Sequence, residues 1–316
     1  MPSPQLGEFP QRLSLSQAKG EHNSGLSKEF MNNSFGTFIA VNTFDLFALV
    51  NLLVIALWYL WAVRRVRNVG SWNSWHTFAF LLGLILLAVV YLGPVSAWSH
   101  TFFWAHMTQH LVVMMAAAPL LVLGAPTTLW FRASSSESRR RWVIPILRSR
   151  TVRWLTDPIL TWIVFAVALI GMHFTGFYNW ALLNHDADYF LEQPIFLIAA
   201  FLFYFPLIGS NLQPRRPSHS FRLASLALMM IPEAITGAVI YFAPVILYPA
   251  FDKVRPFGLD AMGDQQLSGA LMWALVMVVD SGWMMMAASE WFASEEKAGR
   301  RVDREIAQEQ AREMMS

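Results

Sequence analysis

The chain has 316 residues, of which 55% are hydrophobic and 14% are charged, with a formal net charge of +2. Soluble domains carry about 25% charged residues, so this composition excludes an ordinary water-soluble domain and indicates a protein that lies mainly in lipid. Cysteine is absent, which excludes disulfides, thiol catalysis and cysteine-based metal sites. The 16 methionines serve either as packing or as soft-metal ligands.

Apolar runs long enough to cross a bilayer recur along the chain. They cover residues 39–63, 75–97, 100–123, 159–183, 187–209, 223–247 and 267–292. Backbone polar groups within lipid must be satisfied inside each span, so helices are expected. We therefore predict an all-α, polytopic bundle of about seven transmembrane helices. It consists of a polar N-terminal tail (1–38), a membrane domain (39–292) and a C-terminal tail (293–316).

Basic residues predict the orientation of this bundle. Of the 23 Lys and Arg residues, 18 lie in the first, third and fifth loops and the C-terminal tail. Cytoplasmic loops carry such an excess of Lys and Arg. The N-terminal tail is therefore predicted outside and the C-terminal tail in the cytoplasm, which requires an odd number of spans.

The third loop combines arginines with apolar residues between Arg139 and Leu155. Trp142 and Trp154 accompany the arginines there. A segment that only sets topology would explain the arginines but not the tryptophans. We interpret it as a basic interfacial segment on the inner leaflet.

Ionisable residues inside spans are expensive in lipid, so each is a functional candidate. With the predicted orientation, five lie in the outer half of the membrane, and Glu233 and Asp280 lie deeper. A single intramembrane histidine is more often a hydrogen-bond partner than a metal ligand. The carboxyls of Glu233 and Asp280 fit either a proton or ion relay or contacts that pack the helices together. The outer five are Asp45, His106, His110, His173 and Glu192.

The third span carries the most informative pattern. His106 and His110 are four residues apart and therefore share one helix face, and Met107 and Met114 fall in the same sector. Imidazole with thioether is a ligand set that favours copper where no thiolate exists. Packing alone would also explain the methionines.

Two residues on other spans extend this candidate site. His173 lies at a similar depth on the fourth span, and Glu192 starts the fifth. Glu192 fits a metal ligand, a hydrogen-bond partner that orients an imidazole, or a helix-packing contact. The predicted metal ligands are thus His106, His110, His173, Met107, Met114 and Glu192.

The stretch from His106 to Pro126, HMTQHLVVMMAAAPLLVLGAP, resembles the core motif of the CtaG family. These are seven-helix membrane proteins linked to cytochrome c oxidase assembly in bacteria. Residues 155–158 (LTDP), 173–182 with Glu192, and 264–273 (DQQLSGALMW) are also similar to the family. The likeness covers residues 40–290.

The resemblance implies a multi-pass protein of the bacterial inner membrane that helps to mature a haem–copper oxidase. Copper handling on the outer side and cytochrome c oxidase subunits as partners are implied with it. Two positions depart from the family pattern: Thr175 stands where the family has proline, and Gln193 where it has histidine. Gln193 is a poor metal ligand, and His185 in the outer loop is a candidate substitute.

Other functions stay open on the residues alone. A metal transporter would need a path inward, which Glu233 and Asp280 would have to continue. A haem-binding electron carrier would use His173 with His106 or His110 as axial ligands. No nucleophile–base pair, phosphate loop or HExxH motif stands out, so we expect no enzyme, and we expect no nucleic-acid partner.

Overall fold

The computed structural model describes residues 36–41, 44–174, 176–184, 188–209, 212–214, 216–252 and 257–314. The chain divides into two compact units, Met1–Val41 and Asn42–Ser316. The first contains a short helix over residues 36–40. All further description concerns the second unit.

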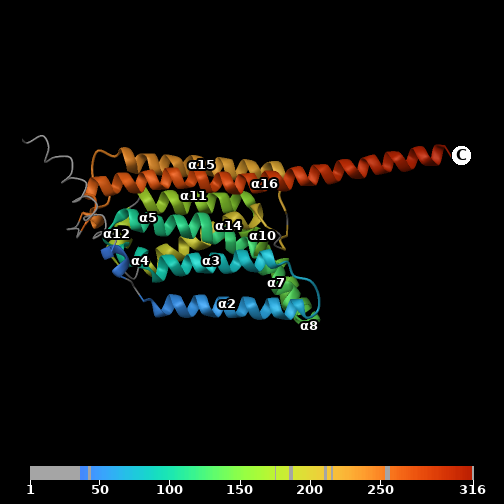
Figure 1. Cartoon of the computed structure of the whole chain (residues 1–316), viewed down its shortest axis with the longest axis horizontal. Helices are drawn as coiled ribbons and strands as arrows, with labels where there is room; N and C mark the ends of the chain where they lie inside the picture. Colours follow the sequence, from blue (N-terminus) through green and yellow to red (C-terminus); the bar gives the residue numbers. More distant parts are fainter. Residues whose placement is uncertain are drawn as a thin grey trace, which may run out of the picture. The chain divides into compact units, whose positions relative to one another are not determined.

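The second unit is helical throughout its described residues, as the sequence predicts (Figure 1). Its first part contains α2 (Leu46–Arg67), α3 (Ser74–Leu92), α4 (Pro94–Trp98), α5 (Phe103–Leu111), η1 (Val112–Ala117), α6 (Ala118–Leu123) and α7 (Pro126–Ala133). The basic segment forms α8 (Ser136–Ser138), η2 (Arg139–Val143), α9 (Ile144–Leu147) and α10 (Arg150–Leu155). Then follow α11 (Pro158–Phe174), α12 (Gly176–Leu183), η3 (Asp188–Glu192), α14 (Gln193–Leu207), α15 (His219–Phe242), η4 (Pro249–Phe251) and α16 (Ala261–Glu313).

Among the described residues, 6 helices are long and apolar enough to cross a membrane. The shorter apolar helix α11 corresponds to the predicted fourth span, and α12 follows it. A helix thus covers each predicted span, while the number of seven spans and their orientation stay predictions.

Apolar side chains on the outside of the bundle agree with a lipid environment. On α2, the side chains of Phe47, Val54 and Leu57 are exposed. A surface this apolar is stable where it faces lipid rather than water.

The predicted start of the first span was wrong. The first span was expected from residue 39, but α2 begins at Leu46, because Asp45 caps it: the amide of Ala48 donates to Asp45 Oδ1 at 2.9 Å. Asp45 is therefore a capping residue rather than an intramembrane candidate. Helix α16 continues from the membrane domain through the predicted C-terminal tail as one helix of 53 residues.

Helices α15 and α16 lie side by side (Figure 1) and approach closely at two glycines. A Cβ atom on Gly237 would come within 2.9 Å of Gly269 O, and one on Gly269 within 2.6 Å of Tyr241 N. Small residues of this kind allow membrane helices to pack backbone against backbone.

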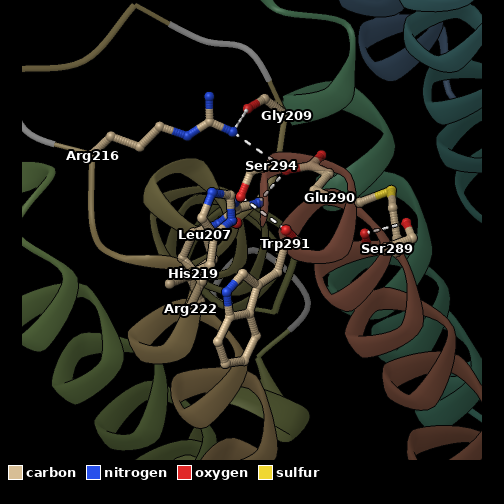
Figure 2. Close-up of polar contacts among 10 residues, drawn as sticks. Leu207, Gly209, Arg216, His219, Arg222, Ser289, Glu290, Trp291 and Ser294 are labelled. Carbon is tan, nitrogen blue, oxygen red and sulfur yellow. Dashed lines mark hydrogen bonds and ion pairs between the residues drawn. The ribbon is translucent and has the colours of Figure 1, made fainter. Parts of the chain in front are cut away.

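A charged cluster joins α16 to the start of α15 (Figure 2). Arg222 is 1% exposed, and its guanidinium donates to Leu207 O and, at 2.7 Å, to Glu290 Oε2. Arg216 approaches the same carboxylate oxygen at 3.4 Å. One buried guanidinium therefore links the end of α14, the start of α15 and the interior of α16.

The basic segment carries exposed aromatic residues. Trp142 is 57% exposed and Trp154 is 70% exposed. Neither side chain is packed inside the bundle, as the interpretation as a membrane-surface segment requires.

A candidate metal site between three helices

The helix that carries His106 and His110 is fixed at its start by a distant carboxylate. Asp264 of α16 is fully buried, and its two oxygens accept from the amides of Phe103 (2.8 Å) and Trp104 (2.9 Å). These are the first two amides of α5, which have no partner within the helix. Asp264 thereby caps α5 across the bundle and sets the position of the histidines one and two turns further on.

The helix is widened just beyond His110. The stretch Val112–Ala117 is a π-helix, and a π turn leaves backbone groups that need other partners. Trp283 of α16 supplies one: its indole Nε1 donates to Met115 O at 2.8 Å. Single π turns are frequent at functional sites.

Glu192 meets the two histidines at the start of the fifth span. It is the last residue of another π-helical turn, η3, which leads into α14. Its side chain is fully buried, and Oε1 lies 2.9 Å from His110 Nε2 and 3.3 Å from His106 Nε2. A buried carboxylate in this position needs a proton or a cation beside it, because the free energy of its hydration is lost on burial.

The ligand atoms of these three residues converge. The Nε2 atoms of His106 and His110 are 2.6 Å apart. One ligand atom from each of His106, His110 and Glu192 lies within 4.8 Å of the others. Two imidazole nitrogens facing each other in this way can share one proton, or both can turn their lone pairs to one cation. Two imidazoles and a carboxylate suit copper or zinc.

His173 lies beside this group on α11. Its Nδ1 lies 2.7 Å from Leu169 O, and since a carbonyl only accepts, Nδ1 carries the proton. Its Nε2 is then left with a free lone pair, and it is buried without a hydrogen-bond partner among the described residues. This is the state of an imidazole that can accept a cation.

Aromatic rings connect His173 with the other histidines. The Phe196 ring lies 4.5 Å from that of His110 and 6.0 Å from that of His173. Tyr178 stacks on His173 at 5.4 Å and lies 6.2 Å from His106. Each of the three imidazoles therefore packs against the ring of Phe196 or Tyr178, and we call this group of rings the aromatic enclosure.

A loop residue completes the enclosure. The hydroxyl of Tyr248 donates to His173 O at 3.1 Å, and its ring lies 5.1 Å from Tyr178. Burial raises the pKa of the Tyr248 phenol above its ordinary value, so the hydroxyl keeps its proton and remains a donor.

The remaining predicted ligands have less direct support. Met107 and Met114 are buried in the apolar core, and their role as ligands stays a prediction. Because Met114 lies within the π-helix, its direction differs from that in a regular α-helix. His185 lies outside the described residues.

Gln193 takes part in a hydrogen-bonded chain beside the site. Its amide donates to Gln109 Oε1 at 3.4 Å and its Oε1 accepts from Tyr91 at 3.3 Å. Gln109 in turn donates to Val90 O. Gln193 therefore joins the second, third and fifth spans.

Glu233 and Asp280 form a separate buried group on α15 and α16. Tyr204 donates to Asp280 Oδ1 at 3.0 Å and to Met115 Sδ at 3.7 Å. The Glu233 carboxyl is fully buried and lies beside that of Asp280. Tyr204 follows Glu192 by 12 residues, so this group lies about 18 Å further along α14.

Comparison with known proteins gives a family match. The model of the cytochrome c oxidase caa3 assembly factor family matches residues 57–294. An uncharacterized protein of Mycobacterium bovis is 26% identical over 218 residues, which cover 66% of this chain and 33% of the relative. One of Mycobacterium leprae is 25% identical over 234 residues, which cover 72% and 35%. The chain thus spans about a third of the length of these curated relatives. No solved structure matches it significantly.

Proposed function

Because the chain belongs to the family of cytochrome c oxidase caa3 assembly factors, we propose that it supplies copper to a haem–copper oxidase. The copper is cargo, held by His106, His110 and Glu192 on the outer side of a bacterial cell membrane. The observation that carries the proposal is the convergence of these three buried ligand atoms from two helices within 4.8 Å.

The chemistry of the enclosure supports this role. Imidazole nitrogens bind copper well, and the chain has no cysteine to compete for it. The free lone pair of His173 is available as a further ligand. Met107 or Met114 would add a thioether, which favours Cu(I).

The partner in this proposal is an oxidase subunit that receives the metal. The role is transfer rather than catalysis, so the site needs ligands that bind copper and then release it. A carboxylate ligand such as Glu192 is suited to this, because oxygen binds Cu(I) weakly compared with sulfur.

Transport of a metal through the membrane is the second candidate. The buried carboxyls of Glu233 and Asp280 favour it, since they lie further along the bundle than the histidines. Loss of a transporter would change the copper content of the cytosol. Loss of an assembly factor would change only that of the oxidase.

Copper binding to the purified full-length protein tests the proposal. Cu(I) is titrated without oxygen against a chromophoric chelator, and we expect one tightly held equivalent. Replacing both His106 and His110 by alanine should weaken it by about 100-fold or more, as loss of ligand-shell residues does. His76→Ala is the control, because His76 pairs with Leu123 O near the other end of the third span.

The same preparation distinguishes the alternatives. Copper bound equally by the double variant would refute the site. A visible spectrum with a haem band in the untreated protein, lost in the double variant, would favour an electron carrier instead.

A further inference from the structure

A groove of about 830 Å³ opens at the end of the bundle away from the histidines. Phe131, near the end of the helical run that starts at Phe103, forms part of its wall. Leu147 and Leu212 form apolar wall on the basic segment and on the stretch after α14. Arg148 and Arg153 contribute the positive charge.

The two guanidinium groups in the groove are available to a ligand. Among the described residues, neither the Arg148 nor the Arg153 side chain has a hydrogen-bond, ion-pair or ring partner. Asp157 also lines the groove, but its Oδ1 accepts from the amides of Ile159 and Leu160 at the start of α11. Two guanidinium groups and this one carboxylate leave the groove with a net positive charge.

Neighbouring arginines differ in this respect. Arg132 donates to Ser71 O at 2.6 Å, and Arg141 lies over the ring of Trp142 at 5.4 Å. Among the described residues, Arg140 and Arg150 also lack a side-chain partner, but neither lines the groove, where Arg148 and Arg153 meet.

The surroundings decide which anion fits. Trp154, which is 70% exposed, and Leu155 and Ile146, both exposed, flank the groove on the same segment. Exposed tryptophan with arginine is typical of a segment at the membrane interface. A free phosphate ion would gain nothing from apolar walls, whereas a phospholipid places its headgroup on the cations and its acyl chains against the walls.

We propose that this groove binds the headgroup of an anionic phospholipid, with Arg148 and Arg153 as the phosphate ligands. Arginine binds phosphate through paired, charge-assisted hydrogen bonds. Through this contact, one lipid molecule holds the basic segment against α11 and the stretch after α14. The site is independent of the metal site and of the proposed copper function.

Native mass spectrometry of the full-length protein in detergent tests the proposal. Phosphatidylglycerol and phosphatidylcholine with the same acyl chains are added in turn, and we expect selective retention of phosphatidylglycerol. Arg148→Gln with Arg153→Gln should reduce its affinity by about tenfold or more, the effect of losing one or two charge-assisted hydrogen bonds. Arg140→Gln with Arg150→Gln is the matched control, because it removes the same charge from the same segment outside the groove.

Three results would overturn the proposal. Equal loss in both double variants would indicate diffuse attraction rather than a site. Equal retention of the two lipids would exclude recognition of anionic charge. Displacement of the lipid by millimolar inorganic phosphate would assign the arginines to a free anion. The variants should fold, because both side chains are exposed and unpartnered, and an unchanged unfolding temperature without lipid checks this.

Discussion

The buried guanidinium of Arg222 makes the stability of the bundle depend on Glu290. Glu290→Gln keeps the size of the side chain but removes its negative charge. Arg222, which is 1% exposed, would then remain charged and buried, with Arg216 close by and no carboxylate between them. The reverse change, Arg222→Met, leaves Glu290, whose side chain is 34% exposed and can be hydrated.

The structure gives the size of the effect. The Arg222–Glu290 hydrogen bond is 2.7 Å long, and a hydrogen bond to a charged group contributes about 1.5–3 kcal/mol. An uncompensated buried charge adds to this loss, so Glu290→Gln should destabilise the protein by roughly 3–4 kcal/mol. Arg222→Met should cost less, about 2 kcal/mol, because it leaves no buried charge behind and only the carbonyl of Leu207 without its donor.

Circular dichroism follows the unfolding of the full-length protein in one detergent over a temperature or SDS series. It ranks the variants by their loss of stability. Glu296→Gln is the control, because it breaks the 2.6 Å ion pair between Glu296 and Arg300, whose side chains are 64% and 70% exposed respectively. Exposed pairs of this spacing contribute about 0.3–0.5 kcal/mol. Equal effects of Glu290→Gln and Glu296→Gln, or a larger effect of Arg222→Met, would refute the reasoning.

Three further predictions concern the site and the orientation. The double variant His106→Ala, His110→Ala should insert and accumulate normally, while the oxidase subunits are present but short of copper. Extra copper in the medium should partly restore oxidase activity, and unchanged metal content of the oxidase would exclude the proposed supply of copper. Asp264→Asn should weaken the cap of α5 by about 1–2 kcal/mol, seen as faster hydrogen exchange of the first two amides of that helix; unchanged exchange would contradict the capping role. Reporter fusions after Gly263 and Lys297 should read outside and inside respectively, and the same side for both would refute the seven-span topology.

Helices and their approximate spans could be predicted because a lipid environment demands long apolar runs with internal backbone bonding. Their ends could not, since the same polar residue can cap a helix or lie within it. Asp45 illustrates this, because hydropathy alone places it inside a span that in fact starts after it. The joining of α16 with the tail helix also escaped prediction, because hydropathy changes where the helix does not.

Part of the candidate site followed from spacing. His106 and His110 had to share a face, and Glu192 was expected at their depth. The cap by Asp264 could not be predicted, because it joins residues about 160 positions apart and depends on how α5 and α16 pack. The π turn after His110 has no reliable sequence signal, so the sequence predicts an α-helical direction for Met114, which in fact lies in a π-helix.

Helix α16 connects the start of α5 with the charged cluster around Arg222 at the other end of the bundle. Asp264, which holds the start of α5, and Glu290, which holds Arg222, are on the same uninterrupted helix. They are separated by about 39 Å at 1.5 Å per residue. A tilt of about 5° around Glu290 would displace Asp264 by roughly 3 Å over that length, enough to break both hydrogen bonds to α5. A force that tilts α16 beyond Glu290 would therefore move Asp264 and loosen the start of α5, which carries His106 and His110.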